Sequence, residues 1–503
     1  MKNKWIHEKA KRCSVYQLMF FFLLSALDVF AEGKSLERKR PEGLLFDVSE
    51  EQRISEDDLK NKPEGWYPVI LPVIAKDETL GNFYGANLNF VNNGSRANPL
   101  FEYTPYRDSL NLAFIYSDLG MRGYYFDYLK KYIKDTPYSV QFSGGYQKIT
   151  NFLYMGIGAE TMNSLTGRDL NDPRNPQMYN MSFDRYSQNL QYRRNSDGNP
   201  YSRYETDTMY NRYISEISGS NVNVDRIIFR VIRLIGGTSF SRNIVRTYDG
   251  KPVRTDELYF PDSGSDLKEI YIKSRLYANT MNGRTKLTED FEKGRITGFH
   301  GGYDNTVRIG ISLDRRDFSV DPTKGYFLEL AHDRSLKIIG SDFEYNKTFA
   351  QGRFYARLFP SALERTVLAL RAGIVSTKGS APFFSYPNMN VTESYMIGLG
   401  GGSTLRGYQL SRFVGPVMGI ANLEIRSRFA SWSHSDHYFT FHFIPFYDIG
   451  RVWDRFSKVS STGYAASYGI GLQISYNLSS VFRLDLAKSR EDSTVNLQMM
   501  HPF

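Results

Sequence analysis

Residues 307–314 read VRIGISLD, in which apolar and polar side chains alternate with a period of two. The same alternation recurs at 469–476 (GIGLQISY) and at 482–487 (FRLDLA). A period of two predicts extended strands with one apolar and one polar face. The polar faces carry charges and glycines, which suits the interior of a transmembrane barrel, although a soluble β-sandwich produces a similar pattern.

The composition favours the barrel. The 503 residues include 36 tyrosines, 35 phenylalanines and 41 glycines, yet the mean hydropathy is only −0.44. That value excludes a helical membrane bundle. Strands of a transmembrane barrel are apolar on one side only, so many aromatic residues with a low mean hydropathy are typical of such a protein. A tyrosine-rich soluble β-protein is the alternative.

The first 31 residues have the features of a secretory signal peptide. Five basic residues precede an apolar run from Leu18 to Leu24, and Val29-Phe30-Ala31 offers a cleavage site of the small-x-small type. The run is too short to span a membrane, and no later stretch has 18 consecutive apolar residues. We therefore expect export with cleavage near Ala31, and no transmembrane helix.

Cysteine content and net charge argue against thiol chemistry and against nucleic-acid binding. The only cysteine, Cys13, lies in the signal, so the mature chain would have neither disulfides nor thiolate chemistry. The net charge is +9, and removing the signal, which carries five basic and two acidic residues, leaves about +6. This modest excess does not argue for nucleic acid as a partner.

The rest of the chain divides into two regions. Residues 32–65 are charged and polar, and Ser55 with Asp58 predicts the capped start of one short helix, so we expect a short periplasmic N-terminal segment. Residues 66–503 alternate strand patterns with turns rich in Gly, Asn and Asp. The predicted strands before the middle of the chain are 66–75, 81–91, 109–117, 123–132, 138–146 and 152–160.

One stretch interrupts this rhythm. Residues 163–222 contain few aliphatic side chains and are expected to form a long polar loop with short embedded strands, or else a linker between domains. About 440 residues at roughly 27 per strand and connection give about 16 strands. The expected fold is all-β: a transmembrane antiparallel β-barrel of 16 strands preceded by the short periplasmic segment.

The last predicted strand covers residues 493–503. Val495, Leu497, Met499 and Phe503 are expected to share its apolar face. A terminal aromatic residue that closes an amphipathic strand resembles the assembly signal of outer-membrane barrels. Pro502 departs from that pattern, although a proline near the end of a strand is tolerable.

Residues 398–408, GLGGGSTLRGY, form the most distinctive loop. Gly400, Gly401 and Gly402 predict a hinge, because glycine adopts backbone angles that other residues avoid. The spacing fits neither of the glycine-rich phosphate-binding motifs. No GxSxG nucleophile motif is present, and His434-Ser435-Asp436-His437 is better explained as a solvated turn than as a metal site. We therefore expect no enzyme activity and no catalytic, cofactor or metal site.

Four motifs resemble those of BamA/TamA-type outer-membrane β-barrels, the bacterial surface antigen superfamily. The first is Leu405-Arg406-Gly407-Tyr408, which matches the [VIL]RG[FY] loop motif. The others follow the family's order and are LDRRDFSVDPTKGY at 313–326, Asn422-x-Glu424 at 422–424, and Phe446-x-Asp448-x-Gly450 at 446–450. The similarity is clear over roughly 300–503 and only general over 66–300.

The motifs predict a lock inside the barrel, in which the loop residues Leu405, Arg406, Gly407 and Tyr408 meet Glu424 and Asp448. Alternation places Asn422, Glu424, Arg426 and Arg428 on the polar face of one strand and Asp448 on that of another. A charge that faces hydrocarbon costs about 2–4 kcal/mol, so these carboxylates should face the lumen. Arg406 should pair with Asp448 and, as a second acceptor, with Glu424, because a guanidinium fork suits two carboxylates. The resemblance implies the same role for Arg406.

The resemblance also implies a function. Members of this superfamily insert or export proteins at the Gram-negative outer membrane, so we expect insertion of outer-membrane proteins or translocation of polypeptide or lipid. The expected partners are outer-membrane lipid and nascent outer-membrane proteins or other polypeptides. Residues 32–65 are too few for a POTRA domain, which full members carry before the barrel. A passive pore, or a surface-exposed adhesin or antigen without assembly activity, is the alternative.

Overall fold

The chain forms one large antiparallel sheet in a computed structural model. The structure describes residues 41, 43–77, 81–168, 177–191, 205–250, 252–253, 276–278, 283–358, 366–390, 395–434, 437–498 and 503. The predicted signal peptide, residues 1–31, lies outside these residues. Seventeen strands make up the sheet, of which β13 (Gly302–Tyr303) has only two residues. The 16 longer strands agree with the number predicted from the sequence.

The 16 strands follow one another in chain order. They are β1 (Trp66–Asp77), β2 (Gly81–Asn92), β3 (Asp108–Ser117), β4 (Arg122–Lys130), β5 (Tyr138–Leu153), β9 (Arg212–Ile228), β10 (Ile232–Arg246), β14 (Thr306–Asp314), β15 (Gly325–Ser335), β16 (Tyr345–Arg357), β17 (Thr366–Gly379), β20 (Val417–His434), β21 (His437–Trp453), β22 (Ala465–Tyr476), β23 (Ser480–Ser489) and β24 (Ser493–Gln498). Each pairs antiparallel with the next.

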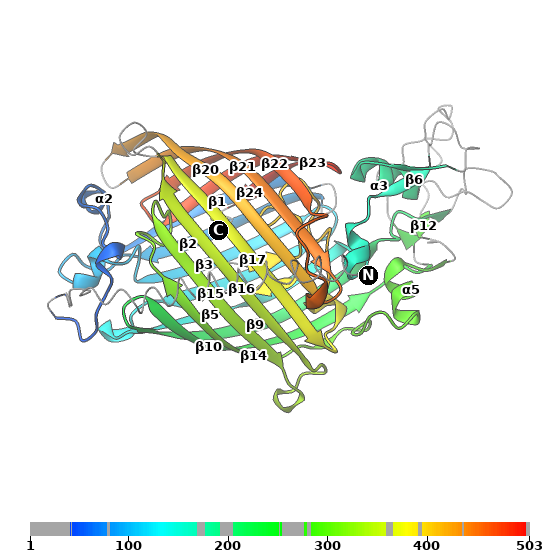
Figure 1. The fold of residues 1–503 in the computed structure, drawn as a ribbon, viewed down its shortest axis with the longest axis horizontal. Coiled ribbons are helices and arrows are strands. Elements are labelled where there is room, and N and C mark those ends of the chain that lie inside the picture. Colours follow the sequence, from blue (N-terminus) through cyan, green and yellow to red (C-terminus); the bar gives the residue numbers. More distant parts are fainter. Residues whose placement is uncertain are drawn as a thin grey trace, which may run out of the picture.

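The sheet curls round into the shape of a barrel (Figure 1). The yellow-green strands β15–β17 lie in front of the blue and cyan strands of the first half, and the orange and red strands follow them round the top. Among the described residues, no pairing joins β1 to β24, so these two strands are the edges of the sheet. One end of the barrel, where β1 begins and β24 ends, is called the short-turn end below. The opposite end is called the long-loop end.

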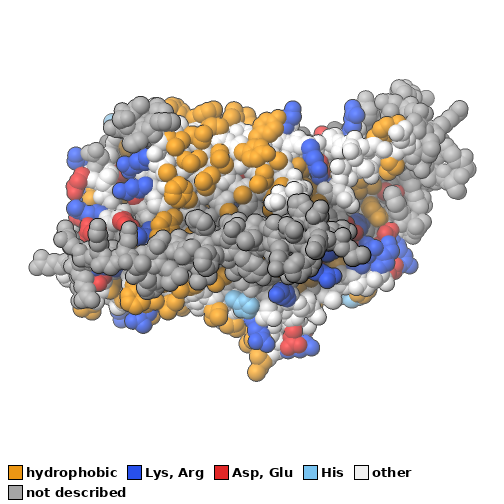
Figure 2. Space-filling view, viewed as in Figure 1, with side chains coloured by type: hydrophobic (Ala, Val, Ile, Leu, Met, Phe, Trp, Pro, Cys, Tyr) orange, Lys and Arg blue, Asp and Glu red, His pale blue; other side chains and the backbone are white. Residues whose placement is uncertain are grey.

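The two faces of the sheet differ as the alternation predicts. On β14, Ile309 and Ile311 are exposed on the outer face, whereas Ser312 and Asp314 are buried on the inner face. Figure 2 shows hydrophobic side chains over the middle of the outer face, with Lys, Arg, Asp and Glu nearer its two ends. An apolar outer band with a polar interior is the arrangement expected of a barrel surrounded by lipid. No helix among the described residues is long and apolar enough to cross a membrane.

The remaining elements lie in the connections. The α-helices are α2 (Glu56–Lys60), α3 (Phe183–Gln191) and α5 (Lys286–Glu292), and the 3₁₀ helices are η1 (Glu50–Gln52), η2 (Pro99–Glu102), η3 (Ile133–Asp135), η4 (Ala159–Met162), η6 (Lys337–Ile339), η7 (Phe383–Ser385) and η8 (Phe456–Lys458). The short strands are β6 (Thr166–Arg168), β7 (Met178–Asn180), β8 (Glu205–Thr206), β11 (Pro252–Val253), β12 (Leu276–Ala278), β18 (Asn388–Asn390) and β19 (Tyr395–Ile397). Helices α3 and α5 lie beyond the long-loop end (Figure 1).

Two predicted boundaries are wrong. The expected polar loop, residues 163–222, ends earlier, because β9 begins at Arg212 and pairs with both β5 and β10. The sequence does not mark residues 212–222 as a strand, because their four apolar side chains are divided between the two faces and Ser, Gly and Asn lie among them. Backbone pairing holds them in the sheet without a strongly apolar side. The predicted strand 152–160 is not separate: β5 extends to Leu153, and η4 occupies 159–162.

Residues 43–62, here called the N-terminal strap, cross the short-turn end of the sheet (Figure 1). The predicted cap is present, since Ser55 Oγ accepts a hydrogen bond from Asp58 N at the start of α2. Apolar strap residues pack against the ends of several strand pairs; these contacts join Leu44, Phe46 and Val48 to Leu100, Tyr132 and Ile227, and Ile54 and Leu59 to Phe101, Phe318 and Leu478. The strap therefore ties together turns that are far apart in the sequence.

Candidate functional site in the lumen

Three strands supply buried carboxylates to one region of the lumen. Glu424 on β20, Asp448 on β21 and Asp485 on β23 are all fully buried, whereas their neighbours Leu423, Tyr447 and Leu484 are exposed on the outer face. Asn422 lies opposite Asp448 in the β20–β21 ladder and donates a hydrogen bond of 2.7 Å to its carboxylate. Glu424 and Asp448 therefore lie on the inner face of the sheet.

The long connection between β17 and β20 reaches back into this region. Its residues 398–413, here called the motif loop, contain the glycine run and the LRGY motif. The run folds into a tight turn, in which Gly401 N donates to Tyr408 O (2.9 Å) and Gly400 N donates to Thr404 Oγ1 (3.0 Å). The hinge motion expected of Gly400, Gly401 and Gly402 stays a prediction.

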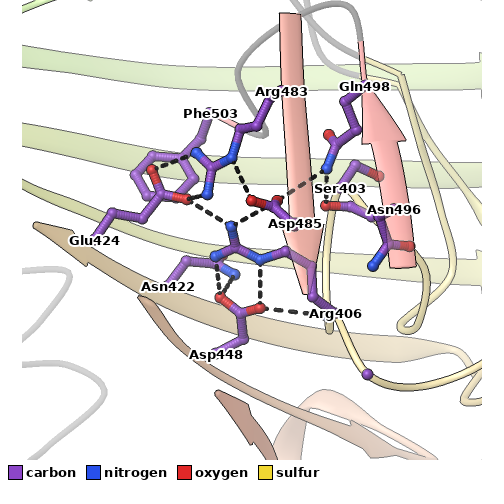
Figure 3. Close-up of polar contacts among 12 residues, drawn as sticks. Ser403, Arg406, Asn422, Glu424, Asp448, Arg483, Asp485, Asn496, Gln498 and Phe503 are labelled. Carbon is purple, nitrogen blue, oxygen red and sulfur yellow. Dashed lines mark hydrogen bonds and ion pairs between the residues drawn. The ribbon is translucent and has the colours of Figure 1, made fainter. Parts of the chain in front are cut away.

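Arg406 is the centre of the site (Figure 3). Its Nε and Nη2 donate to the two oxygens of Asp448 at 2.8 and 2.7 Å, and its backbone N also donates to Asp448 Oδ2 at 3.2 Å. Its Nη1 donates to Glu424 Oε1 at 2.7 Å and to Asp485 Oδ2 at 3.2 Å. The structure thus brings Arg406 together with Asp448 and Glu424, the two acceptors that the sequence indicates. That this contact locks the motif loop in place stays a prediction.

Two further arginines balance the charge. Arg483 donates to Asp485 Oδ1 (2.7 Å) and to Glu424 Oε2 (3.0 Å), and Arg426 donates to Glu424 Oε2 (2.9 Å). Three buried guanidiniums therefore meet three buried carboxylates. Buried charges are tolerated only when they are paired and hydrogen-bonded, so each member depends on the others. This set of six, namely Arg406, Glu424, Arg426, Asp448, Arg483 and Asp485, is called the lumen lock below.

The neighbours of Arg406 explain the spacing of the F-x-D-x-G motif on β21. The guanidinium lies over the Phe446 ring, 3.5 Å from its centroid, so Phe446 and Asp448 face the same side of β21. Gly450, two residues further on, leaves room for Leu405, because a Cβ there would lie 2.8 Å from Leu405 Cδ1. The F-x-D-x-G pattern thus provides a ring, a carboxylate and a gap for the motif loop.

The motif loop also rests on the last two strands. Gly407 has a φ of +90°, and a Cβ there would lie 2.9 Å from the backbone carbon of Lys488 on β23. Gly407 N donates to Thr494 Oγ1 at 3.1 Å, and Gln498 Nε2 donates to Gly402 O at 2.9 Å. The loop therefore supports β24 from the luminal side.

A second ion pair, which the sequence analysis missed, holds the far end of the motif loop. Arg412 is buried and donates to both oxygens of Glu491, at 2.7 and 3.0 Å, in the turn between β23 and β24. It also donates to Thr161 O and Asn163 O, at 2.7 and 2.9 Å. No motif marks Arg412 or Glu491; the only signal was an arginine a few residues beyond the glycine run.

Other predicted residues lie elsewhere. The 313–326 motif forms the β14–β15 turn at the short-turn end, where Arg316 donates to both oxygens of Asp314 at 2.9 and 2.8 Å. His442, which is buried on β21, has its Nε2 3.6 Å from Asp321 Oδ2 and 3.1 Å from Thr440 Oγ1. Among the described residues, no three His, Cys, Asp or Glu side chains are close enough to hold a metal ion.

The predicted position of Phe503 is wrong. Val495 and Leu497 are exposed on the outer face of β24, whereas Phe503 is buried, with 4% of its surface exposed, against the inner side of β16 and β17. The reason is that two arginines and an apolar pocket accommodate the ring on this inner side. Met499 lies outside the described residues. The role of Phe503 as an assembly signal stays a prediction.

Comparisons with known proteins agree with this architecture. The Omp85 superfamily domain model matches residues 82–499, and a domain of unknown function, DUF5982, matches residues 44–107, which include most of the N-terminal strap. No curated protein matches the chain.

Several solved structures are similar to the chain. BamA from Haemophilus ducreyi lacking POTRA domains 1–3 is 13% identical, with a TM-score of 0.43 over 87% of this chain and 69% of that chain. CdiB from Escherichia coli is 11% identical, with a TM-score of 0.46 over 87% and 61%. CdiB from Acinetobacter baumannii is 12% identical, with a TM-score of 0.42 over 88% and 66%. The chain thus spans less than two thirds of the length of each CdiB structure.

Proposed function

The chain belongs to the Omp85 superfamily, and from this premise we propose that it acts on polypeptides at the outer membrane of a Gram-negative cell. It would insert them into the membrane, or move them or lipid across it. The apolar outer band supports a position in lipid, which would make outer-membrane lipid a direct partner. Export with cleavage near Ala31 belongs to the same proposal, and N-terminal sequencing of the mature protein tests it.

The seam between β1 and β24 is the observation that carries this proposal. No pairing joins the two strands among the described residues, so each presents backbone N–H and C=O groups along one edge. Unpaired backbone groups are costly in hydrocarbon, and an edge strand is a template for another strand. An incoming segment that adds to such an edge would satisfy these groups and enter the membrane as a strand.

The lumen lock would hold β24, one of the two edge strands, in position from the luminal side. The motif loop contacts β24 through Thr494 and Gln498, while Arg406 fastens the same loop to β20, β21 and β23. The last strands thus share one internal support, independent of pairing across the seam. This internal support beside the sheet edge is consistent with the assembly role.

Reconstitution tests the proposal. Purified protein in liposomes should accelerate the folding of an unfolded eight-stranded outer-membrane barrel, measured as the heat-modifiable band on gels, relative to protein-free liposomes. Arg406→Ala should reduce the acceleration, whereas Arg334→Ala, at an exposed site, should not. An absence of acceleration by wild-type protein, together with steady single-channel conductance, would favour the passive pore.

The second candidate function is a surface adhesin or antigen. The connections 154–211 and 247–305 are long, carry α3 and α5, and expose Met178, Tyr179 and Phe291. Loops that project from a rigid scaffold commonly carry binding functions. Shortening the 247–305 connection separates the two functions, because it should abolish surface binding while leaving the insertion of barrels in liposomes unchanged.

A further inference from the structure

Phe503 packs against strands that are not neighbours of β24 in the sheet. Its ring contacts Tyr355 on β16 and Val367 and Ala369 on β17, while β24 is separated from β17 by β20–β23. All four side chains are buried. The Phe503 side chain thus links the part of the chain after β24 to strands that share no backbone hydrogen bonds with β24.

Two guanidiniums flank the ring. Arg371 Cζ lies 4.8 Å and Arg426 Cζ lies 5.2 Å from the centroid of Phe503. A cation within about 6 Å of an aromatic face is attracted by the ring quadrupole, and more strongly where water is excluded. Arg426 Nη2 also donates a hydrogen bond of 2.9 Å to Phe503 O. The pocket therefore recognises both the ring and the oxygen next to it.

The same pocket retains unused hydrogen-bonding groups. Arg426 Nη1 and Tyr355 Oη are buried and have no hydrogen-bond partner among the described residues. A buried polar atom without a partner is costly, so such atoms mark places where a ligand oxygen is favoured. Two donors beside one bound oxygen suit a carbonyl or carboxylate with a second oxygen nearby.

We propose that Arg371, Arg426 and Tyr355 form a luminal binding site for an aromatic residue with its carbonyl or carboxylate oxygen, and that Phe503 occupies this site as an internal ligand. The site acts as a latch, because occupancy ties the part of the chain that follows β24 to β16, β17 and β20. The inference does not depend on the proposed function, since a pore, an adhesin or an insertase would hold the same latch.

The latch is connected to the lumen lock. Arg426 binds Phe503 O with Nη2 and Glu424 with Nε, and Glu424 in turn binds Arg406. Arg371 donates to Ser403 O in the motif loop at 2.6 Å and to Asn422 Oδ1 at 2.9 Å. Loss of Phe503 from the site should therefore loosen both β24 and the motif loop. The contacts within the lumen lock should weaken at the same time, because Arg426 belongs to both sites.

Hydrogen exchange of the purified protein tests the latch. Phe503→Leu keeps an apolar side chain but loses the ring, and Phe503→Tyr keeps the ring. We expect backbone amides of residues 493–498 to exchange about tenfold faster in Phe503→Leu and at the wild-type rate in Phe503→Tyr. Equal protection in both variants would overturn the proposal. Heat-modifiability on gels confirms that each variant is folded.

Binding in trans tests the ligand class. A fluorescent Met-His-Pro-Phe peptide, as free acid and as amide, is titrated into Phe503→Ala protein and followed by anisotropy. We expect binding to Phe503→Ala, weaker binding to wild type because its site is filled, and at least about tenfold weaker binding to Phe503→Ala/Arg426→Gln. Tighter binding of the free acid than of the amide would show that the site prefers a carboxylate. Equal binding of the two would show that a carbonyl oxygen is enough, and both results support the site. Equal binding of Met-His-Pro-Ala, or no effect of Arg426→Gln, would overturn it.

Either failure leaves the proposed function testable. A protein that accelerates barrel folding in liposomes but shows no Phe503 effect has the function without the latch. The reverse result gives a latch in a protein with another function. If Phe503→Ala does not fold, the comparison of Phe503→Leu with Phe503→Tyr decides alone.

Discussion

Arg406 and Asp448 are joined by two parallel hydrogen bonds, of 2.8 and 2.7 Å, although they lie 42 residues apart and belong to a loop and a strand. Neither side chain is exposed to solvent. A planar guanidinium matches a carboxylate in this bidentate manner, and no other side chain offers the same geometry. The pair therefore fixes the position of the motif loop relative to the barrel wall.

Breaking this pair should destabilise the barrel. Arg406→Ala leaves Glu424, Asp448 and Asp485 with less positive charge around them, and Asp448→Ala removes the bidentate acceptor. Each should cost up to about 3–5 kcal/mol, the range for removing one partner of a buried ion pair. The measurement is the temperature at which the folded band disappears on gels, with the exposed Arg334→Ala as control.

The double variant distinguishes a unit from two separate contacts. If Arg406 and Asp448 act together, Arg406→Ala/Asp448→Ala should be no less stable than the worse single variant. Fully additive losses would show that each side chain acts mainly through other partners. Arg406→Lys should be intermediate, because an ammonium keeps the charge and loses the fork.

Part of this site was predictable from the sequence. Strand alternation alone placed Glu424 and Asp448 on inward faces, and the motif order supplied Arg406. Asp485 and Arg483 also lay on the polar face of 482–487, but no motif connected them to Arg406, since contacts between distant strands depend on register. Phe503 was misplaced for a related reason. Alternation along residues 493–498 carries no information on the two guanidiniums and the apolar side chains of other strands that hold the Phe503 ring on the inner side.

Gly407 should not tolerate a side chain. Its φ is +90°, and a Cβ would lie 2.9 Å from a backbone carbon of β23, which cannot move without disturbing the ladder. Gly407→Ala should therefore cost about 1–3 kcal/mol and loosen the LRGY turn. Gly236→Ala on β10 is the matched control, because a Cβ there meets no atom within 4 Å. Similar melting of both variants would contradict this.

The Arg412–Glu491 pair should hold the motif loop at the long-loop end. Glu491→Ala leaves the buried Arg412 with the carbonyl oxygens of Thr161 and Asn163 as its hydrogen-bond acceptors among the described residues. We expect faster proteolysis within 159–168, with a loss of stability of about 3 kcal/mol or less because these two hydrogen bonds remain. Limited proteolysis followed by mass spectrometry locates the cut. Glu344→Ala, at an exposed site, is the control and should change nothing.

Docking of the N-terminal strap should depend on pH through Lys62. Its Nζ is buried, donates to Phe101 O and Thr104 O at 2.6 Å each, and lies 4.1 Å from the Phe101 ring centroid. Burial lowers the pKa of Lys62 to about 7, whereas the amine of an undocked lysine titrates near pH ~10.4. Between these values the undocked strap binds a proton that the docked strap does not, so docking strengthens as pH rises from about 7 to about 10.

Lys62→Met should remove this pH dependence, because a thioether fills similar space without a charge. The measurement is the rate of proteolytic cutting within 43–62 at pH 7 and pH 9, expressed for wild type relative to Lys62→Met at the same pH, so that changes in protease activity cancel. We expect the ratio to fall from pH 7 to pH 9. A constant ratio would mean that Lys62 keeps its proton when docked, held by the two carbonyl oxygens and the ring. A rising ratio would mean that docking needs the charged amine.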